Sequence, residues 1–404
     1  MLTGLRNDGW ATPDRLVPAA FMALVAYLVL IVYLFVFPGV LAVGPEKVVI
    51  NDFLSFWMAA NNAVHGDPGL AYRTMEFADT QTEFVPNGFY AFFYPPTYLL
   101  LLLPFGVMTS VTAFLSFQAV GLAGIAWAGK KIAGHWHGAL LCVALPTTFN
   151  GIFHGQNALW MAALLGSALY CLSERKEVWA GILIGLMTIK PQLGVLIPFA
   201  LLAGGYWWTF ISASVTVVAL AAVSFLVFGA DTWVAFWEQS TVARSVLTGG
   251  DVDLHKFVSV YGGLRLIGAG PTLAYGLQAL VGAGMLVLVI HVWRQQVALE
   301  AKAIVLIGAG LLATPFILSY DLAVIAIALA FAVKLKGEGR LKPGAMSLGA
   351  ASVAFACIAR ILSEVSSIPT GPLSGILLLW IGLCYVRPEP VPGERYKDRL
   401  PQSA

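Results

Sequence analysis

Long apolar segments separated by short polar breaks run through almost the whole chain. The first, roughly residues 17–43, exceeds the about 20 residues that a helix needs to cross a bilayer. Further apolar runs follow near residues 95–108, 110–129, 138–153, 157–173, 178–189, 191–205, 209–229, 271–293, 302–318, 320–334, 345–363 and 370–386. This pattern predicts an all-α polytopic membrane protein with one membrane domain over residues 1–404.

Several of these runs are too short to cross a membrane alone. The 95–108 run follows Tyr94-Pro95-Pro96, so we expect a re-entrant half-helix that does not span the bilayer. The runs on either side of Gln156, and those on either side of Pro191, meet at polar breaks. The pattern then predicts about twelve crossings with both termini on one side.

The composition agrees with a membrane location. Hydrophobic residues make up 59% of the chain and charged residues 11%, with a mean hydropathy of +0.82, whereas soluble domains carry about 25% charge. A net charge of +2 without a basic patch excludes nucleic-acid binding. The first run is too long for a signal peptide. Four cysteines without metal-ligand spacing, Cys142, Cys171, Cys357 and Cys384, are expected to be small core residues.

The positive-inside rule predicts the sidedness of the chain. With the N-terminus in the cytoplasm, most basic residues between the runs also face the cytoplasm: Lys130, Lys131, Arg175, Lys176, Arg294, Lys334, Lys336, Arg340, Lys342 and Arg387. The tail, residues 388–404, falls on the same side. Two long loops, 44–94 and 230–270, fall outside, and we expect amphipathic helices in the first.

Unusual polar residues gather on the external side of this topology. They are Asp52, the His154-Gly155-Gln156 segment, Lys190, and the Tyr320-Asp321 pair. Charged groups at membrane depth are costly and usually line a cavity or a substrate path. We therefore expect a functional site on this face.

Asp52 begins a helical pattern in the first external loop. Phe53, Phe56, Trp57 and Ala60 recur at helical spacing, which predicts an amphipathic helix at the membrane interface. Asp is a favoured helix N-cap, and a carboxylate in this position is also a candidate catalytic base. The two roles are compatible.

Three basic residues are candidates for binding an anionic group: Lys190, Lys256 and Arg265. Lys190 lies between two apolar runs, where it either snorkels to the interface or binds phosphate with help from the helix dipole after Pro191. The other two lie in the 230–270 loop with Arg244, and bulk anionic lipid is their alternative partner. Trp233, Phe236 and Trp237 share a helical face there, which predicts a second interfacial helix.

Six polar residues are candidates for contacting a substrate: Tyr94, His154, Gln156, Asn157, Tyr320 and Asp321. Each has a structural alternative. Tyr94 is also typical of an aromatic belt, and the 154–157 segment is also typical of a turn with helix caps. Asp321 is either a helix cap or a second carboxylate in the site.

An ordered set of motifs covers most of the chain: Asp52-Phe53, Trp57-x-Ala59-Ala60, Gly66-Asp67-Pro68, Tyr72, Tyr94-Pro95-Pro96, Pro104, Gly155-Gln156-Asn157, Gly181-x-x-x-Gly185 and Ile189-Lys190-Pro191. In these motifs the chain resembles the polyprenyl-phosphate-mannose-dependent mannosyltransferases and their relatives in glycosyltransferase family 87. The resemblance implies a GT-C-type fold, a lipid-phosphate-linked sugar donor and transfer on the extracytoplasmic face. It matches Asp52 to the family's essential Asp, and it matches Lys190 and Gly155-Gln156 to family positions.

One segment departs from the family pattern. Ser319-Tyr320-Asp321 stands where the mannosyltransferase branch tends to carry a His-containing segment. The donor sugar and any second catalytic group are therefore open, and mannose is a family-level expectation.

The expected activity is an inverting hexosyl transfer. Asp52 would act as general base on an acceptor hydroxyl, while Lys190, Lys256 or Arg265 would stabilise the charge of the departing phosphate. We expect no cofactor and no required metal. The expected partners are a polyprenyl-phosphate sugar and a lipid or glycan acceptor at a bacterial inner membrane.

Two other functions fit a polytopic chain with buried charge. A transporter or flippase of lipid-linked sugars is one, although no internal repeat is visible and the polar breaks fall on one side. A lipid-binding scaffold without chemistry is the other. Transfer of sugar from a purified donor distinguishes the enzyme from both.

Overall fold

The structure is a computed structural model that describes residues 7–36, 52–85, 89–249 and 253–387. Within these ranges the chain is helical without strands, and two isolated β-bridges join Phe257 to Leu318 and Leu341 to Val386. Residues 44–51 of the first loop and the tail 388–404 lie outside the described residues. The predictions made for those two segments stay predictions.

The helical elements follow one another in short steps. In chain order they are α2 Pro13–Val36, α3 Phe53–Val64, η1 Leu70–Tyr72, α4 Thr74–Gln81, α5 Pro96–Gly106, α6 Ser110–Ala133, α7 Trp136–Ala144, α8 Pro146–Phe153, α9 Ala158–Ser173, α10 Glu177–Leu186, η2 Met187–Ile189, η3 Pro191–Gly194, α11 Ile197–Gly204, α12 Trp207–Gly249, η4 Leu254–Lys256, α13 Val260–Leu266, α14 Pro271–Arg294, α15 Leu299–Ala313, η5 Ser319–Val324, α16 Ile325–Gly337, α17 Ala345–Ser366, α18 Gly371–Trp380 and the π-helix η6 Ile381–Tyr385.

Five of the described helices are long and apolar enough to cross a membrane. They are Pro13–Tyr33, Ser110–Ala133, Trp207–Thr241, Pro271–Arg294 and Ala345–Ser366. Other apolar helices are shorter, and α5 has 11 residues, which is about 16 Å of helix against a hydrocarbon core of about 30 Å. The prediction of an all-helical polytopic membrane protein is confirmed. The count of about twelve crossings stays a prediction.

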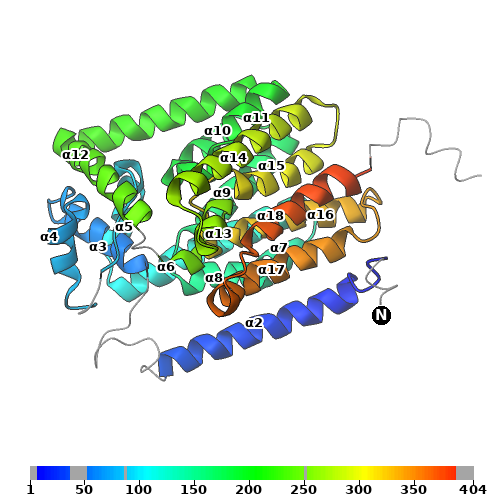
Figure 1. The fold of residues 1–404 in the computed structure, drawn as a ribbon, viewed down its shortest axis with the longest axis horizontal. Coiled ribbons are helices and arrows are strands. Elements are labelled where there is room, and N and C mark those ends of the chain that lie inside the picture. Colours follow the sequence, from blue (N-terminus) through cyan, green and yellow to red (C-terminus); the bar gives the residue numbers. More distant parts are fainter. Residues whose placement is uncertain (1–6, 37–51, 86–88, 250–252, 388–404) are drawn as a thin grey trace, which may run out of the picture.

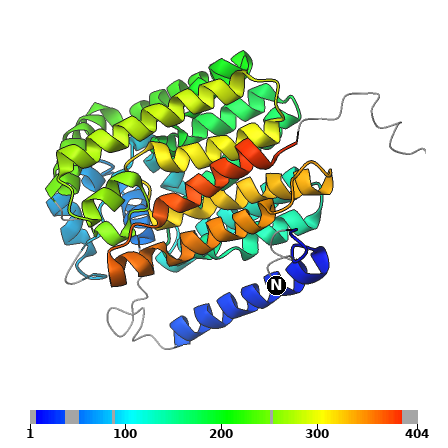
Figure 2. The ribbon, with the colours of Figure 1, turned by 45° about the vertical axis from the view of Figure 1, so that its right-hand side comes forward.

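The centre of the bundle is formed by α15 and α16, which lie among the other helices in Figures 1 and 2. Their residues are buried on nearly every side, from Glu300 to Leu312 in α15 and from Ile325 to Ala332 in α16. A helix that is apolar all round belongs in a core. The segment 314–324, which joins these two helices, is therefore held deep in the protein.

Two of the apolar runs can be compared directly with the helices of the structure. The run 209–229 ends at Gly229, where a φ of 78° interrupts α12, as glycine allows. The run 138–153 is not one helix, because Leu145 is extended before Pro146 and divides the run into α7 and α8. A residue that precedes proline is disfavoured in the helical conformation, so this apolar run contains two helices.

The helix after Asp52 buries its aromatic face against other helices. Phe53, Phe56, Ala59 and Ala60 in α3 are at most 1% exposed, and the helix packs against α5 and α6. The helical period was predicted correctly, and the position of α3 relative to the membrane stays a prediction. Protein covers Phe53 and Phe56, whereas Trp57 in the same helix is partly exposed.

The Gly181-x-x-x-Gly185 motif is a helix-packing surface. A Cβ on Gly181 would lie 2.4 Å from the Thr209 carbonyl oxygen, and one on Gly185 would lie 2.5 Å from the Thr216 Cβ. Small residues at this spacing let two membrane helices approach closely. The motif therefore joins α10 to α12 and has no need of a role in substrate binding.

The cysteines divide into two groups. Cys142 and Cys171 are buried, as predicted, whereas Cys357 and Cys384 are exposed. The outward face of a membrane helix is covered by apolar lipid, so an apolar side chain there needs no protein contact. The prediction of four core cysteines is wrong for these two.

Two groups of contacts attach α2 and the residues before it to the rest of the bundle. Figure 2 shows α2 along the outside of the molecule. The Tyr27 ring stacks on Phe149 at 4.3 Å between ring centroids. At the other end, the Asp8 carboxylate accepts hydrogen bonds from the backbone N–H groups of Gly344, Met346 and Ser347 at 2.9–3.1 Å. Asp8 therefore caps α17 and fastens the start of α2 to it.

Replacing Asp8 should loosen this attachment. Asp8→Ala is expected to lower the free energy of unfolding by about 0.5–2 kcal/mol, as for the loss of a helix N-cap. Thermal unfolding in detergent measures the effect, with Asp14→Ala, which removes an exposed carboxylate in the first turn of α2, as the control. Equal melting temperatures for the two variants would contradict the cap.

Candidate functional site

The Asp52 side chain binds another side chain and does not cap α3. It occupies the N-cap position with a φ of −61° and makes no side-chain cap hydrogen bond. Its Oδ2 atom instead accepts a hydrogen bond from Gln156 Nε2 at 2.6 Å. The side-chain N-cap hypothesis for Asp52 is therefore wrong. The carboxylate is partly exposed and can still reach a ligand.

The turn between α8 and α9 supplies both partners of Asp52. Gly155 adopts a φ of 66° there, a conformation that favours glycine. The turn presents the Gln156 amide, and the His154 carbonyl accepts a hydrogen bond from the Asp52 backbone N–H at 3.3 Å. Main chain and side chain together fix the carboxylate, although the residues are 104 positions apart.

Tyr94 completes a chain of hydrogen bonds. Its hydroxyl donates to Gln156 Oε1 at 3.1 Å, so the amide nitrogen of Gln156 is left to donate to Asp52. Burial raises the pKa of Tyr94, and the carboxylates of Asp321 and Asp52 raise this pKa further. The phenol therefore stays protonated and keeps its donor role.

Lys190 and Asp321 form a buried ion pair. Lys190 Nζ lies 2.5 Å from Asp321 Oδ1, and the two residues are 3% and 1% exposed. The other oxygen, Oδ2, accepts from the Leu318 backbone N–H at 3.0 Å, so Asp321 also caps η5. Snorkelling is therefore wrong for Lys190. Such a pair is strongly coupled, because leaving one charge buried alone is very unfavourable.

The ion pair and the Asp52 network belong to one cluster. Lys190 Nζ lies 4.7 Å above the Tyr320 ring, and that ring lies 5.7 Å from the His154 ring. Burial lowers the pKa of His154, so the imidazole is neutral at pH 7. Its Nδ1 atom is 2.9 Å from the Asn150 carbonyl oxygen. Charged, aromatic and amide groups therefore surround Asp52.

Asn157 is a buried residue beside two phenols. It is 0% exposed, and its amide interacts with the hydroxyl groups of Tyr94 and Tyr98. Its Oδ1 and Nδ2 atoms have no other partner within the described part of the chain. A side-chain amide has two N–H donors and an acceptor oxygen, so this one has further hydrogen bonds to offer to a polar ligand.

The basic residues predicted in the second loop are not equally close to this cluster. Lys256 is exposed at the end of η4, and its charge acts on His154. Arg265 in α13 donates to the Ala269 carbonyl at 3.1 Å, and within the described residues no contact joins it to the cluster. The side chain of Arg244 lies outside the described residues. Of these three, Lys256 is the one that the structure relates to the site.

Arg360 is a basic residue that the sequence analysis missed. It acts on His154 more strongly than Lys256 does and lines a cavity of about 310 Å³ together with Asn150 and Ser319. Most of the cavity lining is apolar, and its walls come from α2, α8, η5 and α17. The guanidinium of Arg360 also pairs with Glu364 at 2.8 Å and lies 3.9 Å from the Asp253 carboxylate. An arginine inside the apolar run 345–363 was a usable signal, because charged residues within membrane helices usually have a partner or a function.

The described residues do not assemble a cluster of metal ligands. In residues 7–36, 52–85, 89–249 and 253–387 no group of three or more His, Cys, Asp or Glu side chains is placed to hold a metal ion. The chemistry available at the site is that of a carboxylate, amides, phenols, a neutral imidazole and nearby cations.

Comparison with known proteins assigns the chain to a family. The model of glycosyltransferase family 87 matches residues 92–315, which is more than half of the 404-residue chain. The match includes Tyr94, Gln156 and Lys190, and it ends before Tyr320. No curated protein and no solved structure matches the chain. The chain therefore belongs to glycosyltransferase family 87 and is a membrane glycosyltransferase.

Proposed function

We propose that this glycosyltransferase moves a hexose, with mannose as the family-level expectation, from a polyprenyl-phosphate donor to a lipid or glycan acceptor. The observation that carries the proposal is the fixed, partly exposed Asp52 carboxylate, held at 2.6 Å by Gln156 beside a cluster of polar side chains. A positioned carboxylate of this kind suits a general base.

Asp52 is proposed to take the proton of the attacking acceptor hydroxyl. The hydroxyl oxygen then bonds to the anomeric carbon, and the bond from that carbon to the phosphate oxygen breaks. The electron pair stays on the phosphate, which changes from a diester to a monoester and gains negative charge. A single displacement inverts the anomeric carbon, so a β-linked donor gives an α-linked product.

The donor phosphate is proposed to bind near Arg360 and Lys256. Both cations lie within electrostatic reach of His154, and Arg360 borders the apolar cavity of about 310 Å³, which suits part of the lipid chain. Cations placed at a departing phosphate stabilise the developing charge, so no metal is required in this proposal. Lys190 acts on the donor through its pair with Asp321, which holds Tyr320 in position.

The sugar is proposed to contact the polar side chains next to Asp52. Asn157 offers a buried amide beside the phenols of Tyr94 and Tyr98. Tyr94, His154 and Tyr320 offer ring faces and polar atoms. Sugars are recognised through hydroxyl groups, which require both donors and acceptors. The Ser319-Tyr320-Asp321 segment, which stands where the mannosyltransferase branch tends to carry a histidine, is expected to affect this part of the site.

The site is proposed to face the extracytoplasmic side of a bacterial inner membrane. Asp321 precedes α16, whereas Lys334 and Lys336 lie in the last turn of the same helix. Basic residues favour the cytoplasmic side. This separation along one helix supports an external position for the Asp52 cluster.

The proposed function is tested with purified protein in liposomes. A polyprenyl-phosphate hexose and the matching nucleotide sugar are supplied separately with a lipid acceptor extract and EDTA. We expect transfer from the lipid-linked donor only, and an unchanged rate with EDTA. Movement of the lipid-linked sugar across the bilayer without transfer would instead identify a flippase.

Arg360→Gln should weaken binding of the donor. Losing a charge-assisted contact with phosphate is expected to raise the donor KM about tenfold with a smaller change in kcat. Arg265→Gln is the matched control, because Arg265 binds the Ala269 carbonyl and no residue of the cluster. An equal donor KM in the Arg360→Gln and Arg265→Gln variants would show that Arg360 does not bind the donor.

Gln156→Leu should slow transfer without unfolding the protein. The variant removes a hydrogen bond to a charged group, worth about 1.5–3 kcal/mol, so the rate should fall about 10- to 100-fold. Gln118→Leu is the control, since Gln118 is also buried and its amide lacks a partner within the described residues. Initial rates at saturating donor measure both. A wild-type rate for Gln156→Leu would show that the hydrogen bond from Gln156 to Asp52 does not contribute to transfer.

A further inference from the structure

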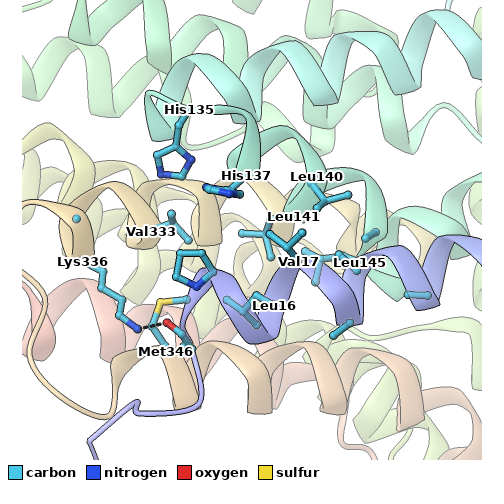
Figure 3. A pocket seen from close by; sticks show the side chains of 17 residues that line it. Leu16, Val17, His135, His137, Leu140, Leu141, Leu145, Val333, Lys336 and Met346 are labelled. Carbon is cyan, nitrogen blue, oxygen red and sulfur yellow. Dashed lines mark hydrogen bonds between the residues drawn. The ribbon is translucent and has the colours of Figure 1, made fainter.

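A long apolar groove lies between the first helix and the bundle, far from Asp52. The start of α2 forms one wall, and α7, α16 and the start of α17 form the others (Figure 3). The cavity measures about 460 Å³, within the range of about 300–1,000 Å³ typical of ligand sites. Most of its lining is apolar and includes Leu16, Ala20, Leu141 and Leu145.

The groove is separate from the proposed active site. Lys336, which lines it, is in the last turn of α16, whereas Asp321 lies in η5, the short helix that leads into the start of α16. The 13 residues of α16 span about 20 Å at 1.5 Å per residue. The two sites therefore lie at opposite ends of one buried helix.

Three basic side chains gather at one end of the groove. They are His135 and His137, whose rings lie 4.9 Å apart, and Lys336. Lys336 Nζ donates to the carbonyl oxygens of Ala11 and Asp8. An ammonium has three N–H donors, so one of them is left for a ligand.

An aromatic side chain marks the membrane depth of this end. Trp136 lies between the two histidines in the sequence, is 49% exposed, and has its ring 4.2 Å from that of His137. Exposed tryptophans concentrate at the level of lipid headgroups. The basic end of the groove is therefore at headgroup depth, and the apolar remainder runs along α2 toward the bilayer centre.

A polar pocket continues the groove beyond His135. This pocket measures about 340 Å³ and shares His135, Val333 and Gly337 with the groove. Its lining adds Lys131 and Ser173. The carboxylates nearby are largely engaged, since Glu300 pairs with Lys334 at 2.7 Å and Glu338 with Arg340 at 3.0 Å. Glu174 also lines the pocket, and its negative charge would repel an anionic headgroup.

We propose that this groove binds one anionic phospholipid, with an acyl chain along Leu16, Ala20 and Leu145 and the phosphate at His135, His137 and Lys336. The apolar window of α2 is 0% buried by protein, so lipid is the natural neighbour of the groove. At its headgroup end Lys336 supplies a positive charge, and the imidazoles of His135 and His137 add polar N–H groups, so this end favours an anionic headgroup. The bound lipid fastens α2 to α7 and α16, beside the Asp8 cap of α17.

The proposal is tested by lipid-dependent stability of the full chain. Purified protein is melted in detergent with phosphatidylglycerol, with phosphatidylcholine of the same acyl chains, or with glycerol phosphate, which has no chain. Phosphatidylglycerol should raise the melting temperature, phosphatidylcholine should do so less, and glycerol phosphate should have no effect. Native mass spectrometry should detect one retained phosphatidylglycerol.

Variants at the basic end separate a headgroup contact from a structural effect. His135→Gln/His137→Gln, which leaves the Lys336 bonds intact, and Lys336→Gln should each weaken phosphatidylglycerol binding about tenfold. Lys130→Gln removes an exposed charge at the same end that does not line the groove and should bind like the wild type. Ala20→Phe should fill the groove and abolish the effect of both lipids.

Three results would overturn the proposal. One is an equal increase in melting temperature with phosphatidylglycerol and phosphatidylcholine, which would mean that the basic end does not distinguish the charge of the headgroup. Another is that the double histidine variant, the Lys336→Gln variant and Lys130→Gln all bind phosphatidylglycerol with the same affinity. Stabilisation by glycerol phosphate alone would also contradict a site for the acyl chain.

Discussion

Asp52→Asn is expected to lower the rate of sugar transfer by about 10²–10⁴-fold, the usual contribution of a general base. The amide keeps the size of the side chain and can still accept the 2.6 Å hydrogen bond from Gln156. It cannot take a proton from the acceptor hydroxyl. The loss should therefore appear in kcat at saturating donor, with little change in donor binding.

The matched control for this variant is Asp79→Asn. Asp79 is an exposed carboxylate in α4 of the same first loop, and its replacement changes the net charge equally. It should leave the rate within a factor of about two, as expected for a surface substitution of about 0.5 kcal/mol or less. A fall of similar size in both variants would mean that loop charge, and not a base, limits the reaction.

Lys190→Met is expected to destabilise the protein by about 3–5 kcal/mol, the effect of leaving one member of a buried ion pair alone. Asp321 is 1% exposed and would keep only the Leu318 backbone N–H as a partner. Thermal unfolding in detergent measures the loss. The same variant should also disturb Tyr320, whose ring lies 4.7 Å from the lysine Nζ atom.

The double variant Lys190→Met/Asp321→Asn tests the origin of this loss. It removes both charges, and the asparagine oxygen can still accept from Leu318. We expect at least half of the lost stability to return, because replacing a whole buried pair is often nearly neutral. If the double variant loses as much free energy of unfolding as Lys190→Met and Asp321→Asn lose together, the two residues are not a coupled pair.

The order of apolar runs predicted much of the fold, but not what covers each helix. The interruption at Gly229 and the separation of α10 from α11 at Lys190-Pro191 follow from residues with strong local preferences. The burial of α3 was not predictable in this way. An amphipathic period shows which face of a helix is apolar, and it does not show whether lipid or protein covers that face.

The candidate site was only partly accessible from the sequence. Asp52, Gln156, Lys190 and Asp321 stand out because polar residues at breaks between apolar runs are costly. Their pairing was not predictable from the sequence, because the partners are far apart in the chain. Gln156 and Asp52 are 104 positions apart, and Asp321 and Lys190 are 131 positions apart. Such contacts depend on how helices pack.

Arg360 shows the opposite limitation. Its charge within the apolar run 345–363 is visible in the sequence, yet its place beside Asn150 and Ser319 follows only from the packing of α17 against α8 and η5. Polar breaks between apolar runs therefore do not reveal a functional charge that lies inside a helix.

The most direct test of the account uses one defined donor, a β-linked polyprenyl-phosphate hexose, in liposomes with wild-type protein or Asp52→Asn. Released polyprenyl phosphate is counted by mass spectrometry, and the new anomeric centre is assigned by NMR. The account predicts one released phosphate for each α-linked product with the wild type, and almost none with the variant. Wild-type turnover by Asp52→Asn, or a β-linked product, would contradict it.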